Sequence, residues 1–139
     1  MLYPKNRSEK LDPSLFENPT SEYRCTPFWA WNCELDESEL LRQIDVMKEM
    51  GMGGFHMHTR VGMSTTYLSD EYMHFIKSCA DKAKRENMLA WLYDEDKWPS
   101  GFGGGYVTKK KENRQKHLLL TAKPYTERSA TEAHYDMSA

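Results

Sequence analysis

The fold is decided by residues 69–93, which read SDEYMHFIKSCADKAKRENMLAWLY. Up to Ala83 the apolar residues of this stretch recur every three or four positions, which predicts a helix with one buried stripe. Ser69 is a residue type that caps helix N-termini, and the apolar pattern ends at Asn87. Residues 88–93 follow, and they are apolar on both faces, as strands buried in a parallel sheet are. The stretch therefore predicts a helix that leads into a parallel strand.

The chain shows the same arrangement upstream. Residues 26–31 (TPFWAW) form a short aromatic run that predicts a buried strand, and residues 54–58 (GFHMH) predict a second one. Between them, Asp36 is followed three residues later by Glu39, a capping-box pair, and an apolar stripe continues to Gly51. Three strands separated by two helices indicate an α/β chain with a parallel sheet covered by helices.

Weaker patterns lie towards the two ends of the sequence. Residues 1–24 are polar and lack a sustained period, so we expect an extended lead-in. The folded domain is expected to cover residues 25–122, with a short helix from about Tyr106 to Asn113 and a fourth strand at 117–121. Residues 123–139 lose the periodicity, which predicts an irregular C-terminal tail.

Composition excludes several classes of protein. The 139 residues include 19 basic and 21 acidic side chains, a net charge of −2, which excludes a generally basic nucleic-acid binder. No run approaches the ~18 consecutive apolar residues of a membrane span, so no membrane partner is expected. The first residues lack the apolar block of a signal peptide, so we expect a cytoplasmic location. The three cysteines lack CxxC spacing, which favours free thiols over a disulfide framework or a zinc ribbon.

Chemically active side chains gather at the three predicted strand ends. Ligand sites of parallel α/β folds lie at the carboxyl ends of the strands. The residues there are Trp29, Trp31 and Asn32; His56, His58 and Arg60; and Tyr93, Asp94, Glu95 and Trp98. Aromatic rings stack on the C–H surfaces of a sugar, and charged groups bind its hydroxyls. These ten residues therefore predict a binding site for a sugar or another polyol.

Some of these residues also have a purely structural interpretation. His56 and His58 are two apart on a strand and share one face. Two histidines on one face, followed by Arg60, favour a site over a hydrogen-bonded core histidine. Trp29 and Trp31 are also strand residues, and at least one of them is expected to pack against the helices.

Two carboxylates directly follow the third strand. Buried carboxylates cost several kcal/mol unless they are paired, so Asp94 and Glu95 are expected at the rim. Neighbouring strand residues point to opposite faces, so one of the two is expected to face a ligand. Glu95 is a weak candidate for a catalytic residue. The glycine-rich stretch GFGGGY at 101–106 matches neither a dinucleotide-binding motif nor a P-loop, and a turn into a helix is expected there.

Four segments of the sequence together resemble one protein family. They are PFWAWN (27–32), KEMGMGGFHMHTR (48–60), YLSDEY (67–72) and LAWLYDEDKWPSGFGGGYV (89–107). This set resembles the N-terminal barrel domain of the large α-L-rhamnosidases, glycoside hydrolase family 106, and related glycosidases. The resemblance implies a (β/α)8 barrel that hydrolyses rhamnosides in plant or bacterial polysaccharides. It also implies an inverting, calcium-assisted reaction with two carboxylates as acid and base.

Compared with that family, the sequence covers part of a domain. A complete barrel takes about 250 residues, whereas three to four βα units are expected here, a partial (β/α)8 TIM barrel. The family's catalytic carboxylates lie downstream of the WPSG segment, so we expect an N-terminal fragment that is inactive alone. No cofactor is expected in the fragment, and calcium is expected in the full-length enzyme. The expected substrate is a rhamnose-containing glycan, and the expected partner is the missing barrel half or a second copy.

Two other functions are compatible with the same residues. An amidohydrolase-like, metal-dependent barrel also places a His-x-His pair at a strand end, where His56 and His58 would hold zinc. A non-catalytic carbohydrate-binding module would use the same aromatic rim without chemistry. Elemental analysis without stoichiometric transition metal would remove the first function, and absent binding of rhamnose-containing oligosaccharides would indicate a catalytically dead remnant in place of the second.

Overall fold

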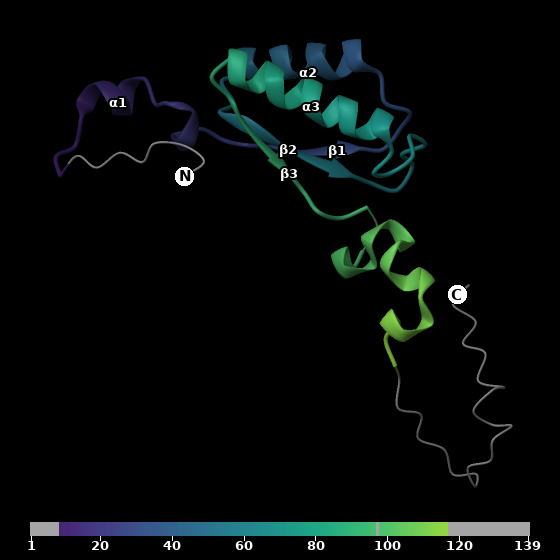
Figure 1. Ribbon diagram of the computed structural model, residues 1–139. Coiled ribbons are helices and arrows are strands. Elements are labelled where there is room, and N and C mark those ends of the chain that lie inside the picture. The colour runs from purple at the N-terminus through teal and green to yellow at the C-terminus, as the bar shows by residue number, and fades with distance from the viewer. Residues whose placement is uncertain (1–8, 97, 117–139) are drawn as a thin grey trace, which may run out of the picture.

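A three-stranded parallel sheet is the centre of the computed structural model, which describes residues 9–96 and 98–116. The strands follow one another across the sheet as β1 (Phe28–Trp31), β2 (Gly54–Thr59) and β3 (Leu89–Leu92). The connecting helices are α2 (Glu37–Glu49) and α3 (Asp70–Arg85). Both helices lie on the same side of the sheet (Figure 1). The predicted α/β class and parallel sheet are confirmed, and the arrangement is compatible with part of an α/β barrel.

Both helices begin at the residues that the sequence indicates. The Asp36 carboxylate accepts a hydrogen bond from the backbone N–H of Glu39 at 2.9 Å, and α2 starts directly after Asp36. Ser69 Oγ accepts from the N–H of Tyr72 at 3.1 Å and caps α3. Each cap satisfies a backbone donor that the first helical turn leaves unpaired. No helix in the part of the chain that the structure describes is long and apolar enough to cross a membrane.

The hydrophobic core fills the space between the two helices and the sheet face beneath them. Its fully buried side chains include Trp31, Ile44, Phe55, Tyr72 and Cys79. Burial raises the pKa of the Cys79 thiol to about 12, so this thiol stays protonated and packs as an apolar group. All three cysteines are free, as predicted.

The opposite face of the sheet has no helix over it in the described part of the chain (Figure 1). The register pairs Phe28 with His56 and His56 with Trp91, and it pairs Ala30 with His58. Because side chains alternate along a strand, these residues share the face that points away from α2 and α3. We call this surface the open face; its members are Phe28, Ala30, Gly54, His56, His58, Leu89, Trp91 and Tyr93.

Both edges of the sheet carry an apolar groove. The groove beside β1 is lined by residues that include Pro27, Val46 and Met52. The groove beside β3 is lined by residues that include Met88 and Leu92. Outer strands β1 and β3 each pair with β2 alone among the described strands. In an α/β barrel the neighbouring βα units cover such edges.

The segment before the sheet differs from the expected extended lead-in. It contains a short helix α1 (Pro13–Glu17) and a 3₁₀ turn η1 (Ser21–Tyr23). The Asp12 side chain caps α1 by accepting from the N–H of Ser14 at 2.9 Å, and Pro13 occupies the first helical position. Proline is pre-organised for that position, which explains a helical turn in a sequence without apolar periodicity.

The segment after β3 also differs from the prediction. In place of one helix from Tyr106 to Asn113, three 3₁₀ turns occur: η2 (Ser100–Gly105), η3 (Val107–Lys109) and η4 (Lys111–Asn113). Lys110 has an extended backbone (φ −83°, ψ 124°), which separates the last two turns. Gly103 and Gly104 have positive φ inside η2, which interrupts it as well. The predicted strand at 117–121 and the predicted tail at 123–139 lie outside the described residues.

Candidate functional site

His58 lies at the centre of an aromatic cluster on the open face. Its ring centroid is 4.3 Å from that of Phe28 in β1 and 4.3 Å from that of Tyr93, directly after β3. Phe28 and Tyr93 also meet edge to face at 5.5 Å. The cluster therefore joins the first residue of β1, a residue near the carboxyl end of β2 and the residue that follows β3, and it leaves His58 only 2% exposed.

The strand register explains how the three rings meet. Ala30 lies beside His58 in the register, and its methyl side chain leaves room on the open face. Phe28 is two residues earlier on β1, on the same face, so its ring reaches His58 along the diagonal. On the other side, Tyr93 continues the line of β3, and its backbone N–H donates to the Met57 carbonyl at 3.0 Å.

The His58 imidazole is neutral at neutral pH. Burial lowers its pKa below the ordinary value of 6.5, and the positive charge of Arg60 acts in the same direction. The negative charge of Glu95 opposes both effects. His58 Nδ1 is buried and has no hydrogen-bond partner among the described residues. Most buried polar atoms are paired, and among the described residues the indole nitrogen of Trp31 is the other buried side-chain atom without a hydrogen-bond partner.

Glu95 is the carboxylate that the structure places in the surroundings of His58. It is 8% exposed and is the one buried carboxylate in the described part of the chain, whereas Asp94 is exposed. Glu95 makes no hydrogen bond or ion pair with any other described residue. The sequence predicts that one of these two neighbours faces a ligand, and Glu95 is the one of the two that is buried.

Arg60 extends the cluster beyond the end of β2. Its guanidinium carbon is 6.0 Å from the centre of the Phe28 ring, within the range of a cation–π contact. Its backbone N–H donates to the Trp31 carbonyl at 2.8 Å, which fixes the start of the loop after β2. A cation, a neutral imidazole and two aromatic rings are thus combined at one rim of the sheet.

His56 lies on the open face as well, but its ring contacts Trp91 and is not part of the cluster around His58. Its ring stacks on Trp91 with a centroid distance of 4.8 Å and an interplanar angle of 11°. Sequence reasoning missed Phe28 and Trp91 as members of this surface. The signal that would have found them is the alternation along the first and third strands, since Trp91 is two residues before Tyr93.

Trp29 and Trp31 lie on the other side of the sheet, away from this cluster. Trp29 Nε1 donates to Gln43 Oε1 of α2 at 2.8 Å, and Trp31 packs edge to face on Tyr72 of α3 at 5.9 Å. Both tryptophans therefore serve the packing between sheet and helices, and the sugar-facing role suggested for them does not fit. The reason is the face that they occupy, because alternation puts them opposite Phe28 and Ala30.

Two further predicted residues lie outside the cluster. Asn32 is exposed just beyond β1, and its carbonyl oxygen lies against Gly62. A Cβ built on Gly62 would be 2.6 Å from that oxygen, and φ at Gly62 is +106°, so a glycine is required there. Trp98 is 85% exposed and has no ring contact among the described residues.

The described residues do not fit a metal site. Within residues 9–96 and 98–116, no group of three His, Cys, Asp or Glu side chains comes close enough to hold a metal ion. The zinc interpretation of His56 and His58 therefore lacks a third ligand in this part of the chain. Calcium takes six to eight oxygen ligands, and the described carboxylates do not assemble such a set either.

Comparison with known proteins gives a similarity of fold to one solved structure. The structure is similar to that of a rhamnosidase from Novosphingobium sp. PP1Y, with a TM-score of 0.51 and 20% sequence identity. The similarity covers 61% of this chain and 9% of that chain. No protein-family model and no curated protein matches the sequence. The likeness therefore supports the partial α/β barrel, and it reaches no further than the fold.

Proposed function

We propose that the described units are part of a glycoside hydrolase barrel and that the open face binds a sugar of a rhamnose-containing glycan. The observation that carries this proposal is the composition of the open face. The interior of an α/β barrel is usually filled by branched aliphatic side chains. Here the face opposite the helices carries two histidines and three aromatic residues, with Leu89 as its one branched aliphatic side chain among the described strands, which suits a binding surface better than a packed interior. The structural likeness to a rhamnosidase supports the same choice of substrate class.

Each member of the cluster around His58 has a chemical role in this proposal. Phe28 and Tyr93 offer aromatic surfaces to the C–H groups of a sugar ring. His58 Nδ1, which has almost no accessible surface in this structure, bonds a sugar hydroxyl once the ring of Phe28 or Tyr93 moves aside, as donor or as acceptor according to its tautomer. Arg60 donates hydrogen bonds to ring or hydroxyl oxygens at the edge of the site.

Hydrolysis in this proposal needs more than the described residues provide. Glycosidases use two carboxylates, one on each side of the bond that breaks. Glu95 is the candidate for one of them, as acid or base, because it is buried and lies near His58. The second carboxylate would come from another barrel unit, seated against one of the two open sheet edges. The described units alone are therefore expected to bind without turning over substrate.

Titration of the full chain with methyl α-L-rhamnopyranoside, followed by calorimetry, tests the binding. The F28A and Y93A variants are each expected to lose roughly three- to tenfold in affinity, since an aromatic contact is worth about 0.5–1.5 kcal/mol. F16A is the matched control, because Phe16 is an exposed aromatic residue of α1, a helix that lies apart from the sheet (Figure 1). Binding that is absent, or equally weakened by F16A, would contradict the proposal.

An aryl α-L-rhamnoside assay on the same chain tests the second part. No turnover above background is expected for the wild-type chain or for E95Q. Robust turnover that E95Q abolishes would retain the glycosidase assignment and overturn the requirement for a further barrel unit. Turnover that E95Q leaves unchanged would remove Glu95 from the mechanism.

A further inference from the structure

A hollow lies at the carboxyl end of β2, beside the cluster around His58. Its volume is about 330 Å³, in the lower part of the usual range for ligand pockets, and it is lined by residues 60–67 and Asp96. We call it the rim hollow. Neither Asp96 nor the loop at 61–67 has a role in the function proposed above.

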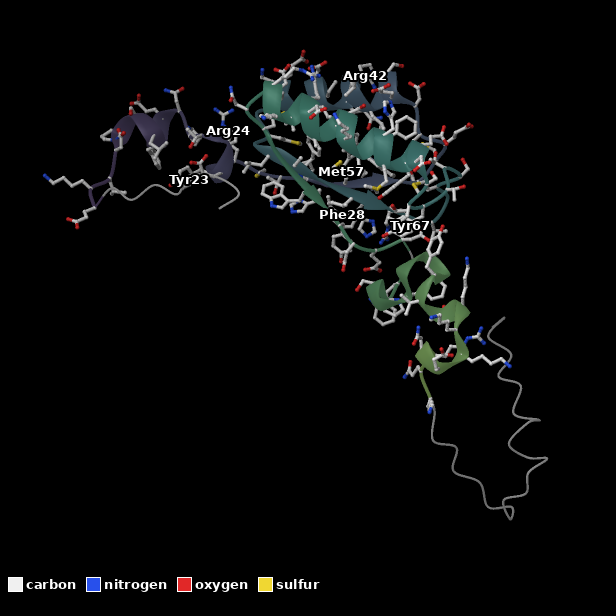
Figure 2. All side chains as sticks on the ribbon, in the orientation of Figure 1. Tyr23, Arg24, Phe28, Arg42, Met57 and Tyr67 are labelled. Carbon is white, nitrogen blue, oxygen red and sulfur yellow. The ribbon has the colours of Figure 1, made fainter. Side chains whose placement is uncertain are left out.

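The glycine-rich stretch forms a wall against the residues of the rim hollow. A Cβ built on Gly104 would lie 2.6 Å from Cδ1 of Tyr67 and 3.6 Å from Oδ2 of Asp96. The backbone of Gly104 therefore lies directly against both residues, in a left-handed conformation with φ of +61°. Figure 2 shows Tyr67 at the end of the sheet, next to the 3₁₀ turns. Close approach of backbone to a side chain explains why this stretch needs glycine.

The polar groups of the rim hollow suit a neutral ligand with several hydroxyls. Arg60 and Asp96 contribute opposite charges to its wall, and neither forms an ion pair within the described residues. The Tyr67 hydroxyl donates to the Asp94 carbonyl at 3.3 Å, so its oxygen can still accept a hydrogen bond. Burial raises the pKa of Tyr67, and the nearby charges of Asp96 and Asp94 add to this effect, so the hydroxyl stays protonated.

Charge balance decides between classes of ligand. A lone anion would meet Asp96, and a lone cation would meet Arg60, whereas a sugar hydroxyl can donate to the carboxylate and accept from the guanidinium. The side chains of Val61 and Met63 in the same wall offer apolar surface to a sugar ring. Arg60 also contacts Phe28 on the open face, so one residue connects the two places.

We propose that the rim hollow is a second sugar subsite, which takes the unit next to the one held on the open face, with Asp96 and Tyr67 as its specificity-determining residues. This inference rests on the proposed function for its substrate class. The lining of the rim hollow comes from the loop after β2 and from Asp96, and it shares Arg60 with the cluster on the open face.

The test uses the full chain labelled with ¹⁵N-glycine and titrated with methyl α-L-rhamnopyranoside. Gly62 lines the rim hollow and Gly104 lies against Tyr67 and Asp96 of its lining, so both report on it, and Gly54 in β2 reports on the integrity of the sheet. Saturable shifts of the rim signals are expected. D96N is expected to weaken the affinity measured at these signals by roughly ten- to hundredfold, the range of a hydrogen bond to a charged group. The control E49Q removes one charge from the exposed end of α2 and is expected to leave the affinity unchanged.

Comparing the variants G103A and G104A distinguishes the effect of the contact between Gly104 and Tyr67 from the effect of backbone strain. Gly103 and Gly104 both have positive φ, +56° and +61°, so G103A and G104A impose a similar conformational cost. Only at Gly104 does the added Cβ meet Tyr67, at 2.6 Å; at Gly103 it meets the side chain of Val107 at the longer distance of 3.2 Å. A larger loss of affinity in G104A than in G103A is expected, and equal losses would overturn the role of the wall.

The outcomes distinguish failure of the subsite from failure of the proposed function. If F28A weakens binding while the rim signals stay still, the subsite is wrong and the open-face proposal stands. If the rim signals shift and F28A has no effect, the open-face proposal is wrong and the rim hollow stands as an independent site. Rim shifts that D96N and E49Q alter equally would overturn the subsite.

Discussion

The two faces of the sheet are built from alternate residues of the same strands, and they carry different chemistry. The helix-covered face contributes Trp31, Phe55 and Met57 to a core that excludes water. The open face contributes His58 and Phe28, of which the first is buried with an unpartnered nitrogen and the second is 52% exposed. Each face therefore carries one buried polar side-chain atom without a hydrogen-bond partner among the described residues, Trp31 Nε1 and His58 Nδ1, and the faces differ in exposure and in residue type.

Adjacent positions on β2 show this contrast at the shortest range. Thr59 points towards the helices, and its hydroxyl is 3.1 Å from the Tyr72 hydroxyl, a buried hydrogen bond between strand and helix. His58 points the other way and has neighbouring rings but no hydrogen bond at Nδ1. Because burial without a hydrogen bond costs free energy, His58 is a residue that the fold tolerates and that a ligand can stabilise.

The largest expected effect is the loss of stability in F55A, compared with the smaller loss in F28A on the other face of the sheet. F55A removes a ring with no exposed surface from the helix-covered face and is expected to lower the free energy of unfolding by about 3–5 kcal/mol. F28A removes a half-exposed ring from the open face and is expected to cost about 1 kcal/mol or less, because little buried area is lost. Urea unfolding followed by circular dichroism measures both. Equal losses would mean that the open face is covered in solution.

An intermediate effect on the free energy of unfolding is expected for substitutions at the neighbouring residues Thr59 and His58. T59V leaves the buried Tyr72 hydroxyl without its partner and is expected to lower the free energy of unfolding by about 1–3 kcal/mol. H58F replaces an imidazole that has an unpartnered nitrogen by an apolar ring of similar shape, and it is expected to be neutral or stabilising. The same variant is expected to bind methyl α-L-rhamnopyranoside less well. A strongly destabilised H58F would instead assign His58 a structural hydrogen bond with residues outside the described part.

Most of the fold could be predicted because local signals agreed with the tertiary structure. The caps at Asp36 and Ser69 and the unbroken apolar stripe of α3 are short-range features that a sequence displays directly. The turns after β3 could not be predicted in the same way. Their form depends on the contact of Gly104 with Tyr67, and these two residues are far apart in sequence.

The candidate site could be predicted in part, for a related reason. The positions of His58, Arg60, Tyr93 and Glu95 at the ends of the predicted strands were enough to predict them, since a parallel sheet brings its carboxyl ends to one rim. The face on which an aromatic residue lies depends on the register, which is why Trp29 was included and Phe28 was missed. Asp96 was also missed, because its neighbour Tyr67 comes from a loop that no periodicity describes.

The smallest expected effect is the pH dependence that His58 contributes to stability. Burial and Arg60 lower its pKa in the folded state below the ordinary value of 6.5, so the folded chain binds fewer protons than the unfolded chain just below that pH. The contribution of neutral His58 is therefore fully present above pH 6.5, and it is lost as the pH falls from there towards the folded pKa. Urea midpoints measured between pH 8 and pH 5 are expected to fall more for the wild-type chain than for H58F, which lacks the titrating group. Parallel pH profiles for the two proteins would mean that His58 is as solvated in the folded chain as in the unfolded one, and the open face would lose its buried polar group.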